Sequence, residues 1–483
     1  MKKSLIALAA LAATSAFAQS SVTLYGIVEA GVDLGYNRTV DTVTTTRGFT
    51  AAGAAATSPS LTAPTYVNNV LTFGAAVNTG NVVNRTEQKN GMRVQDGNDQ
   101  GSGTSRVGFR GTEDLGGGMN ANFQLEMGLR LDDGAITGGQ AAVPSSGNSG
   151  GNAFGRNAWG GISGGFGEFR IGRQVLGSFG VQANSWSAGS SNGLYDAGAT
   201  TAPLMGGVRF SNAIRYMSPT FGGFKGSLML AAPETEGDTS TSTVTTTTPP
   251  AVAGTVLTTT TSASRRTGVD LALEYANGPA YIGFGYNVRD GANNNTGGVT
   301  GFAVGQTNSN TANPEKISAW TLGGSYDLGV VKPFINYTRQ TTKNDRTDTL
   351  ATGAAATSSS IATNGDSNVR AWSIGLRAPV GAFTIIAGYG NAKTSGLQTS
   401  AVNQNGVVNL YSTNNQRKQT AYQLGASYAL SKRTSLQVNY GQNKLENNTD
   451  AVVTNNNNAA FGANSIRANT KVSAINFGMK HSF

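Results

Sequence analysis

Side chains suited to acid–base or nucleophilic chemistry are scarce in this chain. It contains one histidine, His481, and no cysteine, which argues against histidine-based catalysis and against multi-histidine or thiolate metal sites. The segment Gly388–Thr394 resembles a phosphate-binding loop, but it lacks the glycine before the lysine and leaves a strand-like segment. We therefore expect no catalytic residue, no metal, no cofactor and no enzyme activity.

Basic side chains outnumber acidic ones and give the chain a formal net charge of +9. Such an excess could suggest a nucleic-acid partner. The arginines, however, are spread over many segments, and no aromatic platform accompanies them. We expect no nucleic-acid binding.

The segments that carry these arginines alternate between apolar and polar residues. In the last of them Ile475, Phe477 and Met479 share one face, while Asn476 and Lys480 lie on the other. Glycine supplies 66 of 483 residues, about twice its usual share, and only 13% of residues are charged. Repeated strands of about ten residues with one apolar face are typical of a transmembrane β-barrel.

Connections between these segments alternate between short and long. The short ones are Glu113–Gly118, Ser163–Gly167, Ser218–Gly223, Asn277–Pro279, Asp327–Gly329, Pro379–Gly381 and Ser431–Arg433. The long ones are Tyr36–Thr104, Leu131–Ala153, Gln174–Gly206, Glu234–Ser264, Asp290–Glu315, Thr341–Asn368, Asn391–Gln416 and Leu445–Asn469. Seven short and eight long connections predict an all-β, sixteen-stranded antiparallel barrel with short periplasmic turns, long outer loops and both termini in the periplasm.

The first 18 residues have the features of a secretory signal peptide. Lys2 and Lys3 precede a short apolar run, and Ala16 to Ala18 form a cleavage site, so we expect cleavage after Ala18. The barrel domain then occupies residues 19–483. Aromatic residues near strand ends predict interfacial girdles; they are Tyr25, Tyr216, Tyr275, Tyr326, Tyr428 and Phe483.

Strand alternation also predicts which charged residues face the lumen. Arg106 and Arg209 alternate with apolar neighbours, among them Phe109 and Phe210, that are predicted to face lipid. Arg173 shares the phase of apolar Ile171, so it can face the lumen only where the strand breaks. The other predicted lumenal residues are Arg110, Arg130, Arg156, Arg170, Arg215, Glu29, Asp33, Glu126 and Glu168. Some of these arginines could instead bind lipid headgroups, pair with acids or sit at the rim.

Several motifs resemble general bacterial porins, particularly the β-proteobacterial type. They are Ser21–Gly26, Ser105–Gly118, Asn122–Glu126, Phe154–Trp159, Phe166–Arg173 and the terminal Phe483. The resemblance implies an outer-membrane homotrimer whose third loop folds into the pore, surrounded by outer-membrane lipids and lipopolysaccharide. It also implies that the strand ending at Phe483 is recognised by the barrel assembly machinery.

The same resemblance places a basic ladder, here Arg106, Arg173 and Arg209, opposite the third loop. That loop, Gln174–Gly206, holds a single acid, Asp196, and no base. A basic wall with little acid opposite favours anions, so we expect passive diffusion of small hydrophilic solutes, with a preference for anionic ones. The alternatives are a substrate-specific channel with a binding site, or an adhesin that uses polar loops such as Thr239–Thr261.

Overall fold

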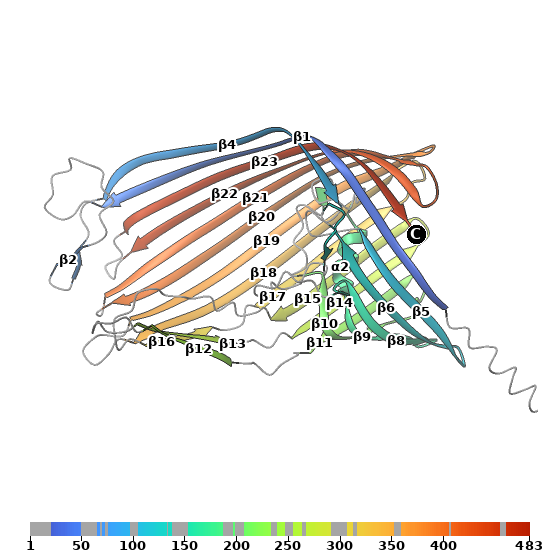
Figure 1. Cartoon of the computed structure of the whole chain (residues 1–483), viewed down its shortest axis with the longest axis horizontal. Helices are drawn as coiled ribbons and strands as arrows, with labels where there is room; N and C mark the ends of the chain where they lie inside the picture. Colours follow the sequence, from blue (N-terminus) through green and yellow to red (C-terminus); the bar gives the residue numbers. More distant parts are fainter. Residues whose placement is uncertain are drawn as a thin grey trace, which may run out of the picture.

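Antiparallel strands pair edge to edge until the last meets the first, which closes a sixteen-stranded barrel and confirms the predicted fold (Figure 1). The computed structural model describes residues 21–49, 65–67, 70–72, 76–96, 105–132, 134–137, 153–186, 197–198, 207–232, 239–246, 255–262, 267–290, 307–312, 316–351, 359–404, 407–454 and 460–483. Residues 1–20, with the predicted signal peptide, and Asp196 lie outside this description.

The barrel strands follow one another in chain order around the wall. They are β1 (Ser21–Phe49), β5 (Arg106–Gly116), β6 (Met119–Leu129), β8 (Asn157–Gly164), β9 (Gly167–Val175), β10 (Arg209–Met217), β11 (Phe224–Ala231), β14 (Gly268–Asn277), β15 (Ala280–Asp290), β17 (Lys316–Tyr326), β18 (Lys332–Ala351), β19 (Ser359–Val380), β20 (Phe383–Gln404), β21 (Val407–Ala429), β22 (Thr434–Thr454) and β23 (Ala460–Ser482). The remaining elements lie in the long connections: β2 (Thr65–Val67), β3 (Val70–Thr72), β4 (Ala76–Asp96), β7 (Ile136–Thr137), α2 (Gly177–Asn184), β12 (Thr239–Thr246), β13 (Thr255–Ser262) and β16 (Thr307–Ala312).

Closure joins the two ends of the chain. Strand β1 pairs with β23 along one edge and with β5 along the other. The backbones of Gly26 and Phe483 exchange two hydrogen bonds of 3.0 and 3.1 Å. The Phe483 ring occupies the space that a Cβ on Gly26 would need, so glycine is required there. The C-terminus therefore lies at the short-turn end of the barrel (Figure 1).

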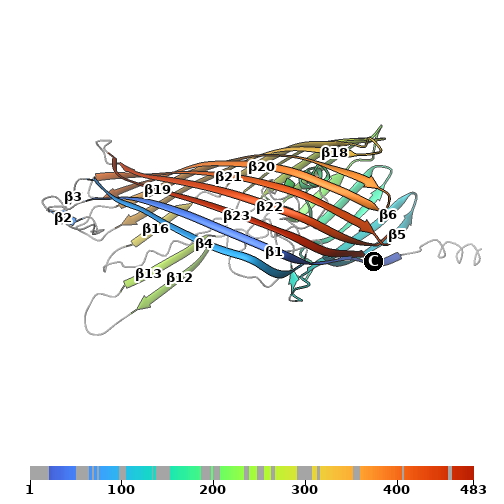
Figure 2. The same cartoon turned by 90° about the horizontal axis from the view of Figure 1, so that it is seen from above.

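Four long connections differ from the prediction because the strands continue through much of them. Strand β1 extends to Phe49 and pairs with β4, and the hairpins β18–β19, β20–β21 and β22–β23 keep their ladders far beyond the predicted loop starts. These long strands project from one end of the barrel (Figure 2). The alternation of apolar and polar side chains stops where both faces of a strand meet water. The hydrogen bonds between the strand backbones do not depend on this alternation, so the strands continue to pair.

The outward face carries apolar side chains between two rows of aromatic rings. Tyr216, Tyr275 and Tyr428 stack on neighbouring phenylalanines near the short turns, with ring centroids 4.6–4.8 Å apart. A second row lies nearer the long hairpins and contains Trp320, Tyr337, Trp372, Tyr389 and Tyr422. Two such rows are typical of the two interfaces of a membrane. In the part of the chain that the structure describes, no helix is long and apolar enough to cross a membrane.

Candidate functional site

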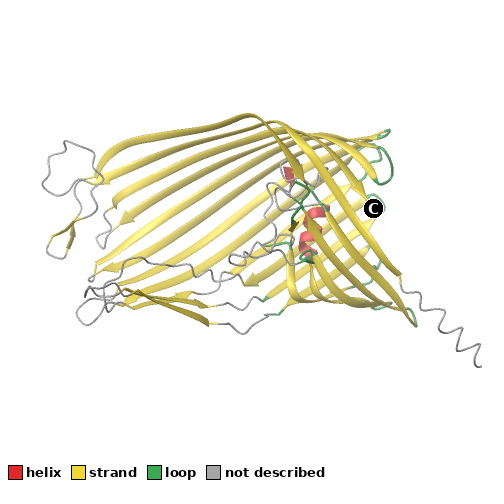
Figure 3. Ribbon diagram, in the orientation of Figure 1, coloured by secondary structure: helices red, strands yellow, loops and turns green. Residues whose placement is uncertain are grey.

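The third long connection enters the barrel and places α2 inside it (Figure 3). The backbone N–H of Gly177 donates to Asp270 Oδ2 at 2.7 Å, and that of Ser178 donates to Oδ1 at 3.2 Å. Asp270 is fully buried on β14 and satisfies two N–H groups that the start of a helix leaves without partners. The carboxylate of a neighbouring strand thus caps α2 in place of its own N-cap residue, Leu176, whose side chain makes no cap bond.

Glycines on the barrel wall make room for α2. A Cβ on Gly285 would lie 2.7 Å from the Ser178 Cα, and one on Gly283 would lie 2.7 Å from a Val181 methyl. Beyond the helix, Asn336 Nδ2 donates to Ser185 Oγ at 2.7 Å. Any side chain at positions 283 or 285 would push α2 away from the wall, so these glycines determine how closely α2 packs against the barrel wall.

The same connection crosses to the far side of the lumen. The backbone N–H of Ala197 donates to Gln423 Oε1 on β21 at 3.3 Å, whereas α2 is bound to β14 on the other wall. The segment between them, with Asp196, is outside the described residues. The loop therefore spans the barrel interior, as expected for a loop that narrows a pore.

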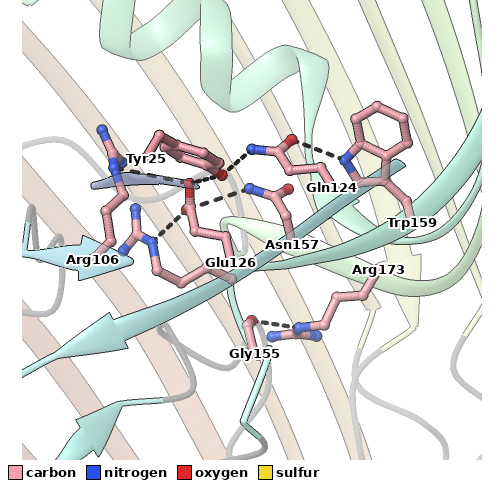
Figure 4. A network of polar contacts seen from close by, with 9 residues as sticks. Tyr25, Arg106, Gln124, Glu126, Gly155, Asn157, Trp159 and Arg173 are labelled. Atoms are coloured by element: carbon pink, nitrogen blue, oxygen red, sulfur yellow. Dashed lines mark hydrogen bonds and ion pairs between the residues drawn. The ribbon is translucent and has the colours of Figure 1, made fainter. Parts of the chain in front are cut away.

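Facing this loop, a cluster of buried and half-buried polar side chains surrounds one carboxylate, Glu126 on β6 (Figure 4). Arg156 Nε donates to Glu126 Oε1 at 2.7 Å, and Arg106 Nε lies 3.9 Å from Oε2. The Tyr25 hydroxyl donates to Oε2 at 2.8 Å. Because Glu126 and Arg156 are only 4% and 7% exposed, their charges interact with little screening by water.

Gln124 and Trp159 complete the network. The Gln124 amide N–H donates to the Tyr25 hydroxyl at 2.5 Å, and the Trp159 indole N–H donates to Gln124 Oε1 at 3.1 Å. These bonds hold Tyr25 inside the barrel, so its assignment to an interfacial girdle was wrong. Tyr25 shares the strand phase of Glu29, and that parity could have placed it correctly.

Arg209 and Arg173 extend the basic cluster. Arg209 is 5% exposed and lies within electrostatic reach of Arg156, Arg173, Arg106 and Glu126. Its Nε has no hydrogen-bond acceptor among the described residues. We call Arg106, Arg156, Arg173 and Arg209 the inner cluster.

Arg173 joins the cluster opposite a β-bulge, although its own strand, β9, does not end there. Ser211 and Asn212 on β10 together face Arg173, and Asn212 has a φ of 49°. Arg173 Nε donates to the Gly155 carbonyl at 2.6 Å, and Nη1 donates to Ser211 Oγ at 2.7 Å. The bulge also shifts the phase of β10, so Phe210 does not face lipid as predicted but is buried against Leu176.

The remaining acids that were predicted to line the lumen each contact a base. Asp33 accepts from Arg93 Nε at 2.8 Å, and Glu168 accepts two bonds of 2.8 and 2.9 Å from Arg170. Glu29 lies 3.8 Å from Lys480 Nζ. Each of these three carboxylates therefore has a basic side chain of its own beside it, outside the inner cluster.

The other predicted lumenal arginines are dispersed along the wall. Arg215 donates to the Val175 carbonyl and to Ser227 Oγ, both at 3.1 Å. The guanidinium of Arg110 lies 5.3 Å from the Tyr25 ring centroid, and that of Arg170 lies 3.9 Å from the Trp159 ring centroid. Arg130 follows β6, where its backbone N–H donates to the Ala135 carbonyl.

Sequence reasoning did not single out Asp270 and did not place Arg156 at the constriction. Asp270 alternates with outward Val269, so strand parity carried a signal for it. Arg156 was placed among lumenal residues but not in the constriction. Alternation predicted its face, but its contact with Glu126 depends on the segment before β8, which no strand pattern describes. Within the described ranges, no group of acidic and histidine side chains could hold a metal ion.

Comparisons with known proteins agree with this architecture. The family model described as Gram-negative porin matches residues 4–448. The chain is 28% identical to outer membrane porin protein 32 of Delftia acidovorans over the full length of both chains. It is also 28% identical to an outer membrane porin protein of Bordetella pertussis, over 90% of this chain and 92% of that protein.

Among solved structures, an anion-selective porin from Comamonas acidovorans covers 96% of this chain and 100% of its own, with 23% sequence identity and a TM-score of 0.48. The loop L8 deletion mutant of OmpT, an outer membrane protein of Vibrio cholerae, covers 96% and 99% with 14% identity and a TM-score of 0.47.

Proposed function

The chain belongs to the Gram-negative porin family and is an outer-membrane porin, and from this premise we propose that it lets small hydrophilic solutes diffuse passively, with a preference for anions. Solutes pass the constriction between the inner cluster and the loop that carries α2. Arg106, Arg209, Arg156 and Arg173 supply the positive charge of this constriction.

One observation carries the anion preference: among the described residues, Arg106 and Arg156 lie beside Glu126, and Arg209 is within electrostatic reach of Glu126 and of the other three arginines of the inner cluster. The opposing helix, α2, has no acidic side chain in its first turn and no basic one in its last turn. In a pore with low-dielectric walls, a gathering of positive side chains raises the local concentration of anions and lowers that of cations.

The proposed mechanism requires no conformational change. The buried bonds of Glu126 and the caps from Asp270 hold the two sides of the constriction in place. A solute is therefore selected by its size and by the sign of its charge. Apolar solutes pass slowly because they displace water from the polar lining and form no hydrogen bonds with it in return.

The proposed topology places the short turns and both termini in the periplasm and the long hairpins outside the cell. The proposed export route uses residues 1–18 as a signal peptide cleaved after Ala18, and barrel assembly machinery that recognises the strand ending at Phe483. The channel works as a homotrimer, an assembly that rests on the resemblance to porins.

Planar-bilayer recording of the purified protein tests this function. In a KCl gradient the reversal potential should show that chloride is more permeant than potassium. In Arg106→Gln/Arg209→Gln, the chloride-to-potassium permeability ratio should fall on the order of tenfold, because two charges near the ion path are removed.

The matched control is Lys432→Gln/Arg433→Gln, which removes two exposed charges from the β21–β22 turn. It should keep the permeability ratio of the unmodified protein. A clear preference of the unmodified channel for potassium would refute the proposed anion selectivity. Saturable conductance that a solute blocks would favour a substrate-specific channel.

A further inference from the structure

A neutral hydroxyl group occupies the carboxylate oxygen that lies nearest to Arg106 (Figure 4). The Tyr25 hydroxyl donates to Glu126 Oε2 at 2.8 Å, whereas Arg106 Nε lies 3.9 Å from the same oxygen, beyond hydrogen-bond distance. The other oxygen, Oε1, accepts from Arg156 Nε at 2.7 Å. Glu126 is therefore bonded to one arginine of the inner cluster and kept apart from another.

A charged donor would be the stronger partner for this oxygen. Hydrogen bonds between a guanidinium and a carboxylate are roughly twice as strong as those of a neutral donor, and they are about 2.8 Å long. Arg106 would therefore need to move only about 1 Å to bind Glu126 Oε2. Because the oxygen accepts from Tyr25 instead, other contacts must hold Tyr25 in this place.

A chain of hydrogen bonds with one direction orients the Tyr25 hydroxyl. The Trp159 indole N–H can only donate, and it donates to Gln124 Oε1 at 3.1 Å. The amide N–H of Gln124 therefore points the other way and donates to the Tyr25 oxygen at 2.5 Å. Since this oxygen already accepts from Gln124, the hydroxyl proton of Tyr25 is directed to Glu126.

Gly108 on β5 provides the space for the Tyr25 ring. A Cβ at position 108 would lie 2.7 Å from both Cζ and the hydroxyl oxygen of Tyr25. The guanidinium of Arg110, two residues further along β5, lies 5.3 Å from the centroid of the ring. The ring is therefore held over β5, two residues from Arg106, by contacts that do not involve Glu126.

We propose that Tyr25 is a positioning residue, which sets the ion selectivity by keeping Arg106 out of an ion pair with Glu126. With Oε2 occupied, the Arg106 side chain stays 29% exposed in the lumen. A closed pair would draw this guanidinium to the wall and weaken its field in the ion path, because the two opposite charges would then lie in contact. The proposal rests on the proposed anion preference and explains how it is maintained beside a carboxylate.

Tyr25→Phe removes the hydroxyl and keeps the ring over Gly108. Arg106 should then bind Glu126, and in planar-bilayer recording the chloride-to-potassium permeability ratio should fall on the order of twofold. The matched control is Tyr216→Phe, which removes a hydroxyl that donates to the Phe166 carbonyl on the outward face. This control should keep the ratio of the unmodified protein.

A double-mutant cycle separates positioning from packing. In Glu126→Gln no charged partner remains for Arg106, so the addition of Tyr25→Phe should leave the permeability ratio of that variant unchanged. A role of Tyr25 in packing alone predicts the same effect in both backgrounds. That result would overturn the proposal, and so would an unchanged ratio in Tyr25→Phe itself.

Phenylglyoxal, which modifies accessible guanidinium groups, gives a measurement that does not depend on ion selectivity. Peptide mapping should show slower modification of Arg106 in Tyr25→Phe than in the unmodified protein, and a restored rate in Tyr25→Phe/Glu126→Gln. Equal rates in Tyr25→Phe and the unmodified protein would contradict the positioning role. If the unmodified channel prefers potassium, the proposed anion selectivity fails, whereas the modification rates still decide the role of Tyr25.

Discussion

The inner cluster and a second basic group on the outward face differ in how their charges are compensated. This second group, the outer belt, consists of residues that face one another across β18 to β21: Arg339, Arg370, Lys393 and Lys418. Inside the barrel, Arg106 and Arg156 share Glu126, which also accepts from Tyr25. On the outer belt, Arg370 and Lys393 face each other without a carboxylate between them. The inner charges are held in one geometry by buried bonds, whereas the outer ones remain exposed side chains.

This difference shows that one barrel wall carries positive charge on both of its faces, under different constraints. A diffusing ion must leave the pore, so the inner cluster keeps part of its charge neutralised and its side chains fixed. Strand parity decides between the two, because successive residues of a strand face opposite sides of the wall.

Removing the shared carboxylate should have the largest effect and would make the inner cluster resemble the outer belt. In Glu126→Gln, Arg156 and Arg106 lose their charged partner in a buried site. We expect a loss of about 2 kcal/mol in stability, below the roughly 3–5 kcal/mol of a completely broken buried pair because the amide still accepts a hydrogen bond. Thermal unfolding measures this loss.

The same variant should strengthen the anion preference. One negative charge is removed from the constriction, so the chloride-to-potassium permeability ratio should rise, by roughly threefold. An unchanged ratio would show that Glu126 does not influence the ion path. Asp33→Asn is an informative comparison, because Asp33 pairs with Arg93 away from the inner cluster.

Loosening the helix opposite the inner cluster should have a smaller effect on stability. Asp270→Asn keeps the shape of the side chain but removes the charge that caps Gly177 and Ser178. We expect about 1 kcal/mol of destabilisation and noisier single-channel currents, since α2 would be less firmly held. Quiet currents identical to those of the unmodified channel would argue that Asp270 does not position the loop.

Reversing one charge in the outer belt should have the smallest effect, and of the opposite sign. Arg370→Glu places an acid between Arg339 and Lys393 and replaces two repulsive pairs by attractive ones. In detergent without lipid, stability should rise by about 0.5 kcal/mol. Chemical unfolding monitored by tryptophan fluorescence measures the change, and a loss of stability would mean that the opposed charges do not repel in the folded protein.

The fold of this protein is determined largely by its sequence pattern. Alternation identifies strands with one lipid-facing side, and the alternation of short and long connections sets their number and closes the barrel. Both patterns are visible in the sequence because the membrane constrains every strand. One face of each strand must be apolar, and no strand edge can remain unpaired. Local motifs, among them Ser105–Gly118 and Asn122–Glu126, indicated the porin family that the family model then showed.

The details of the constriction were decided by tertiary structure. The bulge at Ser211 and Asn212 shifts the phase of β10, and alternation alone cannot show where an extra residue enters a ladder. Arg156 joins Glu126 from outside any strand, and Asp270 meets α2 only because the loop folds back into the barrel. These contacts join residues far apart in the chain, so local pattern restricts which faces they occupy, whereas the closed barrel determines which of them meet.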